Sequence, residues 1–248
     1  PQGTGYARVI VSPTGRALWI SQLADGTRVR GAGHLGPQGG VNHWQLLYRR
    51  TGSILFEADI NDSDELDAVG DWVKFPPQPT RERSYADGFG DDPRGPVGLL
   101  ATGGRWEKPG RGENLLDGLG IDEIGDNLFI NFIDGGIGDS ATDPDTLATL
   151  DARNRIAVSD PNPARVTAVL NRNTGMLTGL LRPIDDNPEN PGRDLVRTTR
   201  FIGIWVPRLD RAEGAFQLKQ LADPGTTTGR TSPILSGQVE VTPQAPPP

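Results

Sequence analysis

The chain has 248 residues, of which 35% are hydrophobic and 23% charged, so its composition is that of a globular protein rather than a disordered one. Its formal net charge of −7 disfavours nucleic acid as a partner, because an acidic surface repels a phosphate backbone. The sequence contains no cysteine, which excludes disulfides, thiolate metal sites and cysteine nucleophiles.

Apolar and β-branched residues alternate with polar ones over the first 60 residues, and short turns interrupt the alternation. The predicted strands are 6–12, 16–23, 27–35, 41–49 and 53–60. The turns contain Gly15, Gly26 and Gly52, which we expect at the positive-φ positions of hairpins. Short connections between successive strands predict an antiparallel up-and-down meander.

The segment GAGHLG (31–36) matches the G-x-G-x-x-G pattern of a dinucleotide-binding loop. Such a site needs a helix directly after the loop, whereas here a proline–glycine turn and another predicted strand follow. We therefore interpret these glycines as strand residues. A hairpin centred on Gln38 and Gly39 would place Gly33 opposite Trp44, whose indole would fill the gap that glycine leaves.

The same register would pair His34 with His43, the two histidines of the sequence. Cross-strand Cβ atoms lie about 5 Å apart, which is close enough to share a metal ion. A third ligand would have to come from elsewhere in the chain. The alternative is an exposed histidine pair on the face of the hairpin that lies away from Trp44.

Acidic side chains gather in DINDSDELD (59–67) and in IDDNPENPGRD (184–194), and carboxylate oxygens are the ligands that Ca²⁺ prefers. The candidate calcium ligands of the first run are Asp59, Asn61, Asp62 and Asp64. Neither run has the spacing of an EF-hand or of the RTX nonapeptide. Solvated acidic loops are therefore the favoured interpretation, with calcium as the alternative.

The middle of the chain has a different character. Residues 61–96 are acidic and then proline-rich, with one predicted strand at 72–75 that stops at a proline pair. A weak helical turn precedes a strand predicted at 127–133. Residues 138–151 are polar enough to predict a surface loop or a single helical turn.

Alternation returns after residue 154, with a further turn glycine at Gly175. The predicted strands are 155–159, 164–171, 176–182, 195–206, 213–221 and 234–242. Two of the later segments, 164–181 and 216–223, resemble the earlier segments 7–18 and 18–25. We interpret this as an internal repeat, a divergent duplication of one meander; chance recurrence of a common hairpin pattern is the alternative.

No motif of a serine hydrolase, a zinc protease or a P-loop occurs, and we predict no enzymatic activity. Aspartate and glutamate are plentiful enough for the carboxylate pair of a glycosidase, but no spacing indicates one. Among the five tryptophans, alternation predicts that Trp44 and Trp205 are buried. Trp106 lies in a loop-like segment and is the candidate for stacking on a glycan, although large aromatic side chains more often serve packing.

Eight segments come in a recognisable order, and the resemblance that they carry covers most of the chain, from Tyr6 to Thr242. They are LADGT (23–27), HWQLLYRRTGSI (43–54), DWVKFPP (71–77), SYADGF (84–89), NRNTGMLTGLL (171–181), TTRFIGIWV (198–206), GAFQL (214–218) and SGQVEV (236–241). Together they resemble a β-rich module of very large bacterial surface and secreted proteins, in which it accompanies Ig-like domains. The resemblance implies a structural role and no catalytic residue. It also implies that Tyr85 and Phe89 cap an open end of a meander.

The two ends of the chain carry no targeting signal that we recognise. The first residue is proline rather than methionine, which favours a piece of a longer protein. We interpret residues 243–248 as a stiff proline-rich linker, with a frayed terminus as the alternative. No apolar run reaches the ~20 residues that a membrane-spanning helix needs, so we expect no membrane insertion.

These observations predict an all-β protein of two consecutive antiparallel up-and-down meanders, barrel-like or sandwich-like, that form one rigid unit. The predicted subdomains are 1–96 and 97–242. The predicted function is that of a non-enzymatic structural or adhesive module at the cell surface or outside the cell, with other modules, further copies of the chain or a filament as partners. The alternatives are a carbohydrate-binding module and a secreted hydrolase. No cofactor is expected apart from the calcium considered above.

Overall fold

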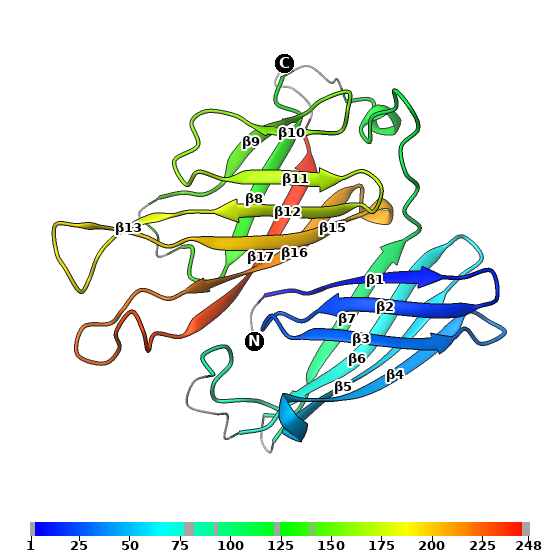
Figure 1. Ribbon diagram of the computed structural model, residues 1–248, viewed down its shortest axis with the longest axis horizontal. Helices are drawn as coiled ribbons and strands as arrows, with labels where there is room; N and C mark the ends of the chain where they lie inside the picture. Colours follow the sequence, from blue (N-terminus) through cyan, green and yellow to red (C-terminus); the bar gives the residue numbers. More distant parts are fainter. Residues whose placement is uncertain are drawn as a thin grey trace. The chain divides into compact units, whose positions relative to one another are not determined.

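A computed structural model describes residues 3–76, 82–91, 94–121, 125–138, 140 and 142–244 (Figure 1). Its regular elements are β-strands and short 3₁₀ helices, and the described residues include no α-helix. All paired strands in the described residues are antiparallel, which confirms the predicted all-β class and the meander architecture. Residue contacts divide the chain into two units. Unit 1 holds residues 7–105, and unit 2 holds residues 3–6 and the described residues from 106 to 244.

Unit 1 consists of two sheets that follow the chain strand by strand. The first sheet contains β1 (Tyr6–Val11), β2 (Arg16–Gln22) and β3 (Arg28–His34). The second contains β4 (Gly40–Leu47), β5 (Gly52–Ile60), β6 (Glu65–Lys74) and β7 (Val97–Gly104), with the 3₁₀ helix η1 (Tyr48–Arg50) between β4 and β5. Figure 1 shows the first sheet lying over the second. Buried side chains from both sheets, among them Trp19, Val29 and Trp72, form the core between them.

The first five predicted strands agree with β1 to β5 to within two residues, but the strands that follow were harder to predict. Strand β6 begins at Glu65, well before the predicted 72–75, and β7 was not predicted. Because β7 pairs with β6 from Glu65–Gly104 to Trp72–Val97, it belongs to unit 1. The division between the units therefore lies after Arg105 rather than between residues 96 and 97.

The predicted hairpin centred on Gln38 and Gly39 is wrong. Strands β3 and β4 belong to different sheets, so the chain crosses from one sheet to the other at this point. Gly33 pairs with Ala17 instead of Trp44. The idea of an indole over a glycine nevertheless holds for Trp19, because a Cβ added at the neighbouring Gly31 would lie 2.3 Å from its Nε1.

Unit 2 is a nearly closed eight-stranded barrel. Its strands are β8 (Leu128–Asp134), β9 (Thr146–Leu150), β10 (Ile156–Val158), β11 (Thr167–Asn171), β12 (Met176–Leu181), β15 (Thr199–Val206), β16 (Arg211–Lys219) and β17 (Ile234–Pro243). Other elements are the hairpin β13 (Ile184–Asp186) and β14 (Asp194–Val196) and the 3₁₀ helices η2 (Asp117–Leu119) and η3 (Pro207–Leu209). The last strand, β17, pairs with the first, β8, while β10 and β11 lie close together at the one seam without a ladder.

Side chains fill the barrel of unit 2. Phe132 lies between Phe201 and Phe216, with ring centroids 5.4 and 5.8 Å away in edge-to-face geometry. Strand β9 contributes Ala148 and Leu150, both fully buried. The prediction of a loop or helical turn over 138–151 is therefore wrong at residues 146–150. Alternate side chains of this short segment are buried, as in a strand of the barrel. The interior of this barrel is a packed core, as small barrels allow.

Three of the four predicted turn glycines, Gly15, Gly26 and Gly175, have φ of 76°, 81° and 67°, which confirms their role. Gly52 is a correction, since it is the first residue of β5 and has no positive φ. A Cβ there would lie 2.6 Å from Cδ2 of Tyr48, so glycine permits close packing at this position. The positive φ angles of this turn fall on residues 48–50.

The proline-rich end is partly strand. Pro243 pairs with Leu128 as the last residue of β17, and the backbone N–H of Gln244 donates to the Asn127 carbonyl at 2.8 Å. The predicted linker therefore does not begin at residue 243, and residues 245–248 lie outside the described part of the chain. The predictions that the units form one rigid body and arose by duplication stay predictions.

Candidate functional site

The two histidines are not brought together by the fold as the sequence predicted. His43 on β4 pairs with Phe56, and its ring lies edge-on to Trp19 with centroids 4.8 Å apart, while His34 is exposed on β3. The His43 ring also shares a hydrogen bond of 3.3 Å with Gln45. Within the described ranges, no three His, Cys, Asp or Glu side chains gather closely enough to hold a metal ion.

The first acidic run forms a tight turn between β5 and β6. The Asn61 side-chain oxygen accepts hydrogen bonds from the backbone N–H groups of Ser63 and Glu65 at 2.9 and 3.0 Å. Asp64 pairs with Arg105 at 2.8 Å, and Asp62 is exposed. These contacts explain the polar residues as turn-forming, in line with the solvated-loop interpretation.

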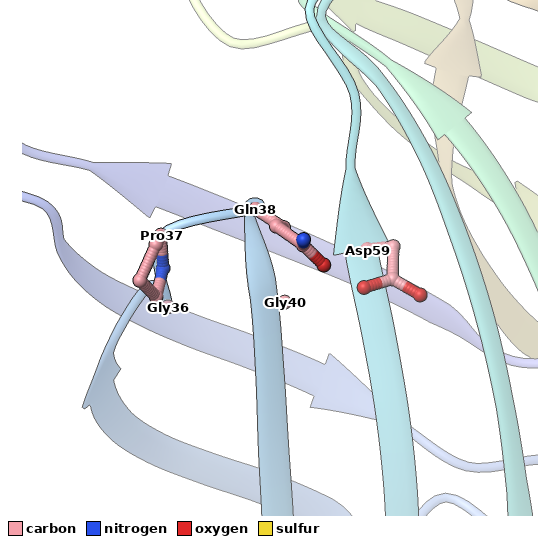
Figure 2. Close-up of a pocket in the computed structure, with 5 residues that line it drawn as sticks. All are labelled: Gly36, Pro37, Gln38, Gly40 and Asp59. Atoms are coloured by element: carbon pink, nitrogen blue, oxygen red, sulfur yellow. The ribbon is translucent and has the colours of Figure 1, made fainter.

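Asp59 lines an open depression of about 300 Å³ at the crossing between β3 and β4 (Figure 2). Its other lining residues are Gly36, Pro37, Gln38 and Gly40. Figure 2 shows the Gln38 side chain extending toward Asp59 across Gly40. A second depression, of about 190 Å³, lies beside β14 and the end of β16, and Glu189 is the one acidic residue in its lining. Neither depression supplies the carboxylate pair of a glycosidase.

The solvent exposure of Trp44 and Trp106 is the reverse of what the sequence predicted. Trp106 is half-buried against the core of unit 2, with its ring over Gly175, so it is a packing residue. Trp44 is 59% exposed, while Trp205 is buried as predicted. The prediction for Trp44 failed because the side chains of β4 alternate in the opposite phase, with Val41 and Leu47 buried.

An apolar stripe crosses the outer face of the β4–β7 sheet. It consists of Trp44, Leu46, Leu55, Val69 and Leu100, and each of these side chains is exposed. The register places Trp44 opposite Leu55 and Val69 opposite Leu100, which is 87% exposed. We call this set the outer stripe. Exposed apolar patches on a soluble protein often mark an interaction surface.

A buried polar cluster lies at the end of β6, and we call it the Lys74 cluster. Its residues are Asp25, Tyr48, Trp72, Lys74, Glu82 and Ser84. Trp72 and Lys74 are two residues apart on one strand, so both side chains face the core. Phe89 forms an antiparallel bridge with Lys74, and Ser84 and Tyr85 lie near the Lys74 amine.

The Lys74 ammonium is fully buried and surrounded by oxygen atoms. Nζ lies 3.0 Å from Oδ2 of Asp25, whose side chain is 2% exposed, and donates to the Ser84 carbonyl at 2.7 Å. Oε1 of Glu82 lies 3.6 Å from the same nitrogen. Nζ also lies 4.7 Å from the centroid of the Tyr48 ring, within the range of a cation–π contact.

Asp25 is held by donors on both carboxylate oxygens. The Tyr48 hydroxyl donates to Oδ2 at 2.6 Å, and the backbone N–H of Thr27 donates to Oδ1 at 2.9 Å. Nε1 of Trp72 in turn donates to the Tyr48 oxygen at 2.9 Å. Burial, followed by the charge of Asp25, raises the pKa of the Tyr48 phenol far above its usual range, so the hydroxyl keeps its proton.

Aromatic rings enclose this polar cluster. Trp72 packs edge-on against Tyr85 and Phe89, with centroids 5.6 and 4.7 Å away. Tyr85 and Phe89 also contact one another at 5.9 Å, so the residues expected to cap the meander pack together at the end of β6. The arrangement places an amine and a carboxylate in contact inside an apolar shell, where electrostatic interactions are strong.

Unit 2 contains a second buried ion pair, between Arg197 and Asp185. Nε of Arg197 lies 2.6 Å from Oδ2 of Asp185, and the exposed fractions of these side chains are 5% and 1%. Nη2 donates to the other carboxylate oxygen at 3.3 Å, and Nη1 donates to the Lys219 carbonyl at 2.9 Å. These hydrogen bonds of the planar Arg197 guanidinium fix the β13–β14 hairpin to the end of β16.

Comparison of the chain with protein-family models, with curated proteins and with solved structures found no match. No helix in the described residues combines the length and apolarity that a bilayer crossing requires. Sequence reasoning missed both buried ion pairs. The one available signal was that Asp25, Tyr48, Lys74 and Ser84 all fall in segments that carried the family resemblance.

Proposed function

We propose that the chain is a non-enzymatic structural or adhesive module that works outside the cell, joined to other modules or to further copies of itself. The observation that carries this proposal is the outer stripe, a row of exposed apolar side chains on an otherwise polar sheet face. Strands β1 and β7 support it, because each ends its sheet and so offers an edge to which another strand can add.

Sedimentation velocity over a wide concentration range tests the proposal. We expect reversible self-association of the whole chain that weakens when Val69 and Leu100 are both replaced by lysine, because each added charge would be buried in the contact. The matched control is Val169→Lys, which changes an exposed valine of unit 2 and should leave association unchanged. A chain that remains monomeric at every concentration, or a control that acts like the double variant, contradicts self-assembly through the stripe.

A carbohydrate-binding role is the second candidate, and the exposed indole of Trp44 favours it. The register surrounds Trp44 with Asn42, Glu57 and Asp71 on the same outer face. An exposed indole beside polar side chains is suited to stacking on a sugar ring. Retardation in polysaccharide gels should be lost on Trp44→Ala and kept on Leu46→Ala; if the unaltered chain is not retarded by any glycan, this candidate is excluded.

A further inference from the structure

We propose that the Lys74 amine and the Asp25 side-chain carboxyl condense to an amide, so that unit 1 carries an internal isopeptide crosslink between the end of β6 and the turn after β2. This inference does not depend on the proposed function. It assigns a covalent modification to two residues that would otherwise form only an ion pair.

Contact and burial are the first argument. Nζ of Lys74 lies 3.0 Å from a carboxylate oxygen of Asp25, and both side chains are almost wholly removed from solvent. A desolvated lysine is a recognised nucleophile, because its neutral amine carries a free lone pair. Holding the two reacting groups in contact also removes the entropic cost of bringing them together.

The groups around Asp25 are the second argument. The Thr27 N–H on Oδ1 can stabilise the negative charge that develops when the carboxyl carbon is attacked. The Tyr48 hydroxyl on Oδ2, which keeps its proton, can donate to the oxygen that leaves. Glu82, 3.6 Å from Nζ, is placed to accept a proton from the amine and return it.

The reaction balances without an oxidant or a co-reactant. The ammonium first gives one proton to the Asp25 carboxylate, which leaves a neutral amine and a neutral acid. The nitrogen lone pair attacks Cγ, so a C–N bond forms, and the C–O bond to Oδ2 then breaks. Oδ2 departs as water with two of the three ammonium protons, one moving through Glu82 or Tyr48. The products are one amide and one water molecule.

The aromatic shell of Trp72, Tyr85 and Phe89 is the third argument, because it disfavours the reverse reaction. Hydrolysis of the amide needs a water molecule beside Cγ, and these rings pack edge-to-face around the end of β6. Excluding water from a site suppresses hydrolysis of what forms there. In a module under tension, the crosslink would keep the chain between Asp25 and Lys74, which are 49 positions apart, from being pulled out straight.

The test is the intact mass of the purified full-length chain under denaturing conditions. We expect a mass lower than that of the sequence by one water, about 18 Da, and a branched peptide after digestion that joins the Lys74 peptide to the Asp25 peptide. A mass equal to that of the sequence means that the pair is ionic only, and it overturns the proposal. Because the branched peptide is sought in the unaltered chain, the result does not depend on how any variant folds.

The Lys74→Arg variant separates the crosslink from another loss of water. Asp25 precedes Gly26, and such a pair can also lose water by closing a succinimide ring with the glycine nitrogen. Lys74→Arg should abolish the loss, whereas a succinimide would persist and overturn the proposal. In Asp25→Asn the same attack expels ammonia, about 17 Da, and this loss supports the crosslink only together with the branched peptide, because an asparagine before Gly26 can also lose ammonia by closing a succinimide ring. Tyr48→Phe should lower the fraction of crosslinked chains at a fixed time after synthesis.

Discussion

Among the described residues, each unit buries one ion pair, and the two pairs differ in their cation. In unit 1 the Lys74 ammonium meets Asp25, and in unit 2 the Arg197 guanidinium meets Asp185. All four side chains are at most 5% exposed. Removing one member of such a pair leaves a buried charge without its partner, which costs far more than the loss of an exposed pair.

The Arg197 pair is suited to holding neighbouring strands in place. A planar guanidinium offers several donors in a fixed fork, and here they reach both oxygens of Asp185 and the Lys219 carbonyl. A guanidinium remains protonated in proteins, so it has no lone pair with which to attack. The pair in unit 2 is therefore a clamp and nothing more reactive.

Lys74 offers the same charge with different chemistry. Its amine can lose a proton, and its neighbours include a phenol that keeps its own proton and a second carboxylate. Burial and charge pairing alone therefore do not define a reactive site. What matters is whether the cation can become a nucleophile and whether proton donors lie on the carboxylate.

The largest effect is expected from Lys74→Ala, because it leaves Asp25 buried without a partner and also prevents the proposed crosslink. Leaving Asp25 buried without a cation costs about 3–5 kcal/mol. Losing a crosslink that closes a loop of about 50 residues removes about 4 kcal/mol more, by analogy with a disulfide. Hydrogen exchange measured by mass spectrometry should show faster exchange across unit 1 and unchanged exchange in unit 2; equal loss in both units would contradict independent stabilisation.

Arg197→Ala is expected to rank second, since it breaks an ion pair but no covalent bond. The unpaired Asp185 should lower the free energy of unfolding of unit 2 by about 3–5 kcal/mol. Hydrogen exchange of the peptides of unit 2, followed against urea concentration, should then show a lower unfolding midpoint. Arg197→Lys is the matched control, because it keeps the charge and loses the fork, at a cost of about 1–3 kcal/mol. If the lysine variant is as unstable as the alanine variant, geometry rather than charge dominates this clamp.

Tyr48→Phe should have an intermediate effect. It removes the donor to Asp25 and leaves Nε1 of the buried Trp72 without its acceptor, so we expect a loss of about 1–3 kcal/mol. Thr51→Ala is a suitable control, because its hydroxyl donates to the Tyr48 carbonyl at 2.7 Å from an exposed position. A Tyr48 variant no less stable than this control would show that the phenol contributes little.

The pH dependence of unit 1 follows from the same phenol. Its pKa is raised in the folded chain, chiefly by burial and then by Asp25, whereas tyrosine in an unfolded chain ionises near pH 10. A raised folded pKa means that the contribution is complete below about pH 10 and declines as the pH rises above it. The urea midpoint should therefore fall between pH 9 and pH 11 in the unaltered chain and fall less in the Tyr48→Phe variant.

The sequence predicted much of the fold because alternation and turn glycines are local signals. Gly15, Gly26 and Gly175 mark real hairpin turns, and strands β1 to β5 lie within two residues of their predicted positions. The phase of alternation was predictable for Trp205 but not for Trp44, since either face of a β-strand can be the buried one. The crossing from β3 to β4 looked like a hairpin because it carries the same Gly-rich turn residues.

The Lys74 cluster could not be predicted from local patterns. The hydrogen bonds that join Asp25, Tyr48, Trp72 and Lys74 link positions 23 to 49 apart, and these residues meet because two sheets pack face to face. Nothing in the spacing of Asp25 and Lys74 distinguishes them from solvated charges of a strand end and a turn. Only the burial of both side chains, set by the aromatic residues around them, gives the pair its chemistry.

The smallest effect is expected at an exposed ion pair of unit 2. Arg155 lies 2.6 Å from Asp151 in the turn between β9 and β10, with exposed fractions of 69% and 34%. Hydrogen bonds from the Arg155 side chain, followed by its backbone N–H, lower the pKa of Asp151 below its usual 3.8. A lowered folded pKa means that the contribution is present above about pH 4 and is lost as the pH falls through the folded value.

Arg155→Gln should therefore raise the pKa of Asp151 in an NMR titration while changing stability at pH 7 by less than about 1 kcal/mol. The pKa should remain below 3.8, because the backbone N–H groups of residues 153 and 155 still donate to the carboxylate. A loss of stability as large as that of Arg197→Ala would mean that burial does not separate the strong pairs from the weak one. A pKa that does not move would mean that backbone donors alone set it.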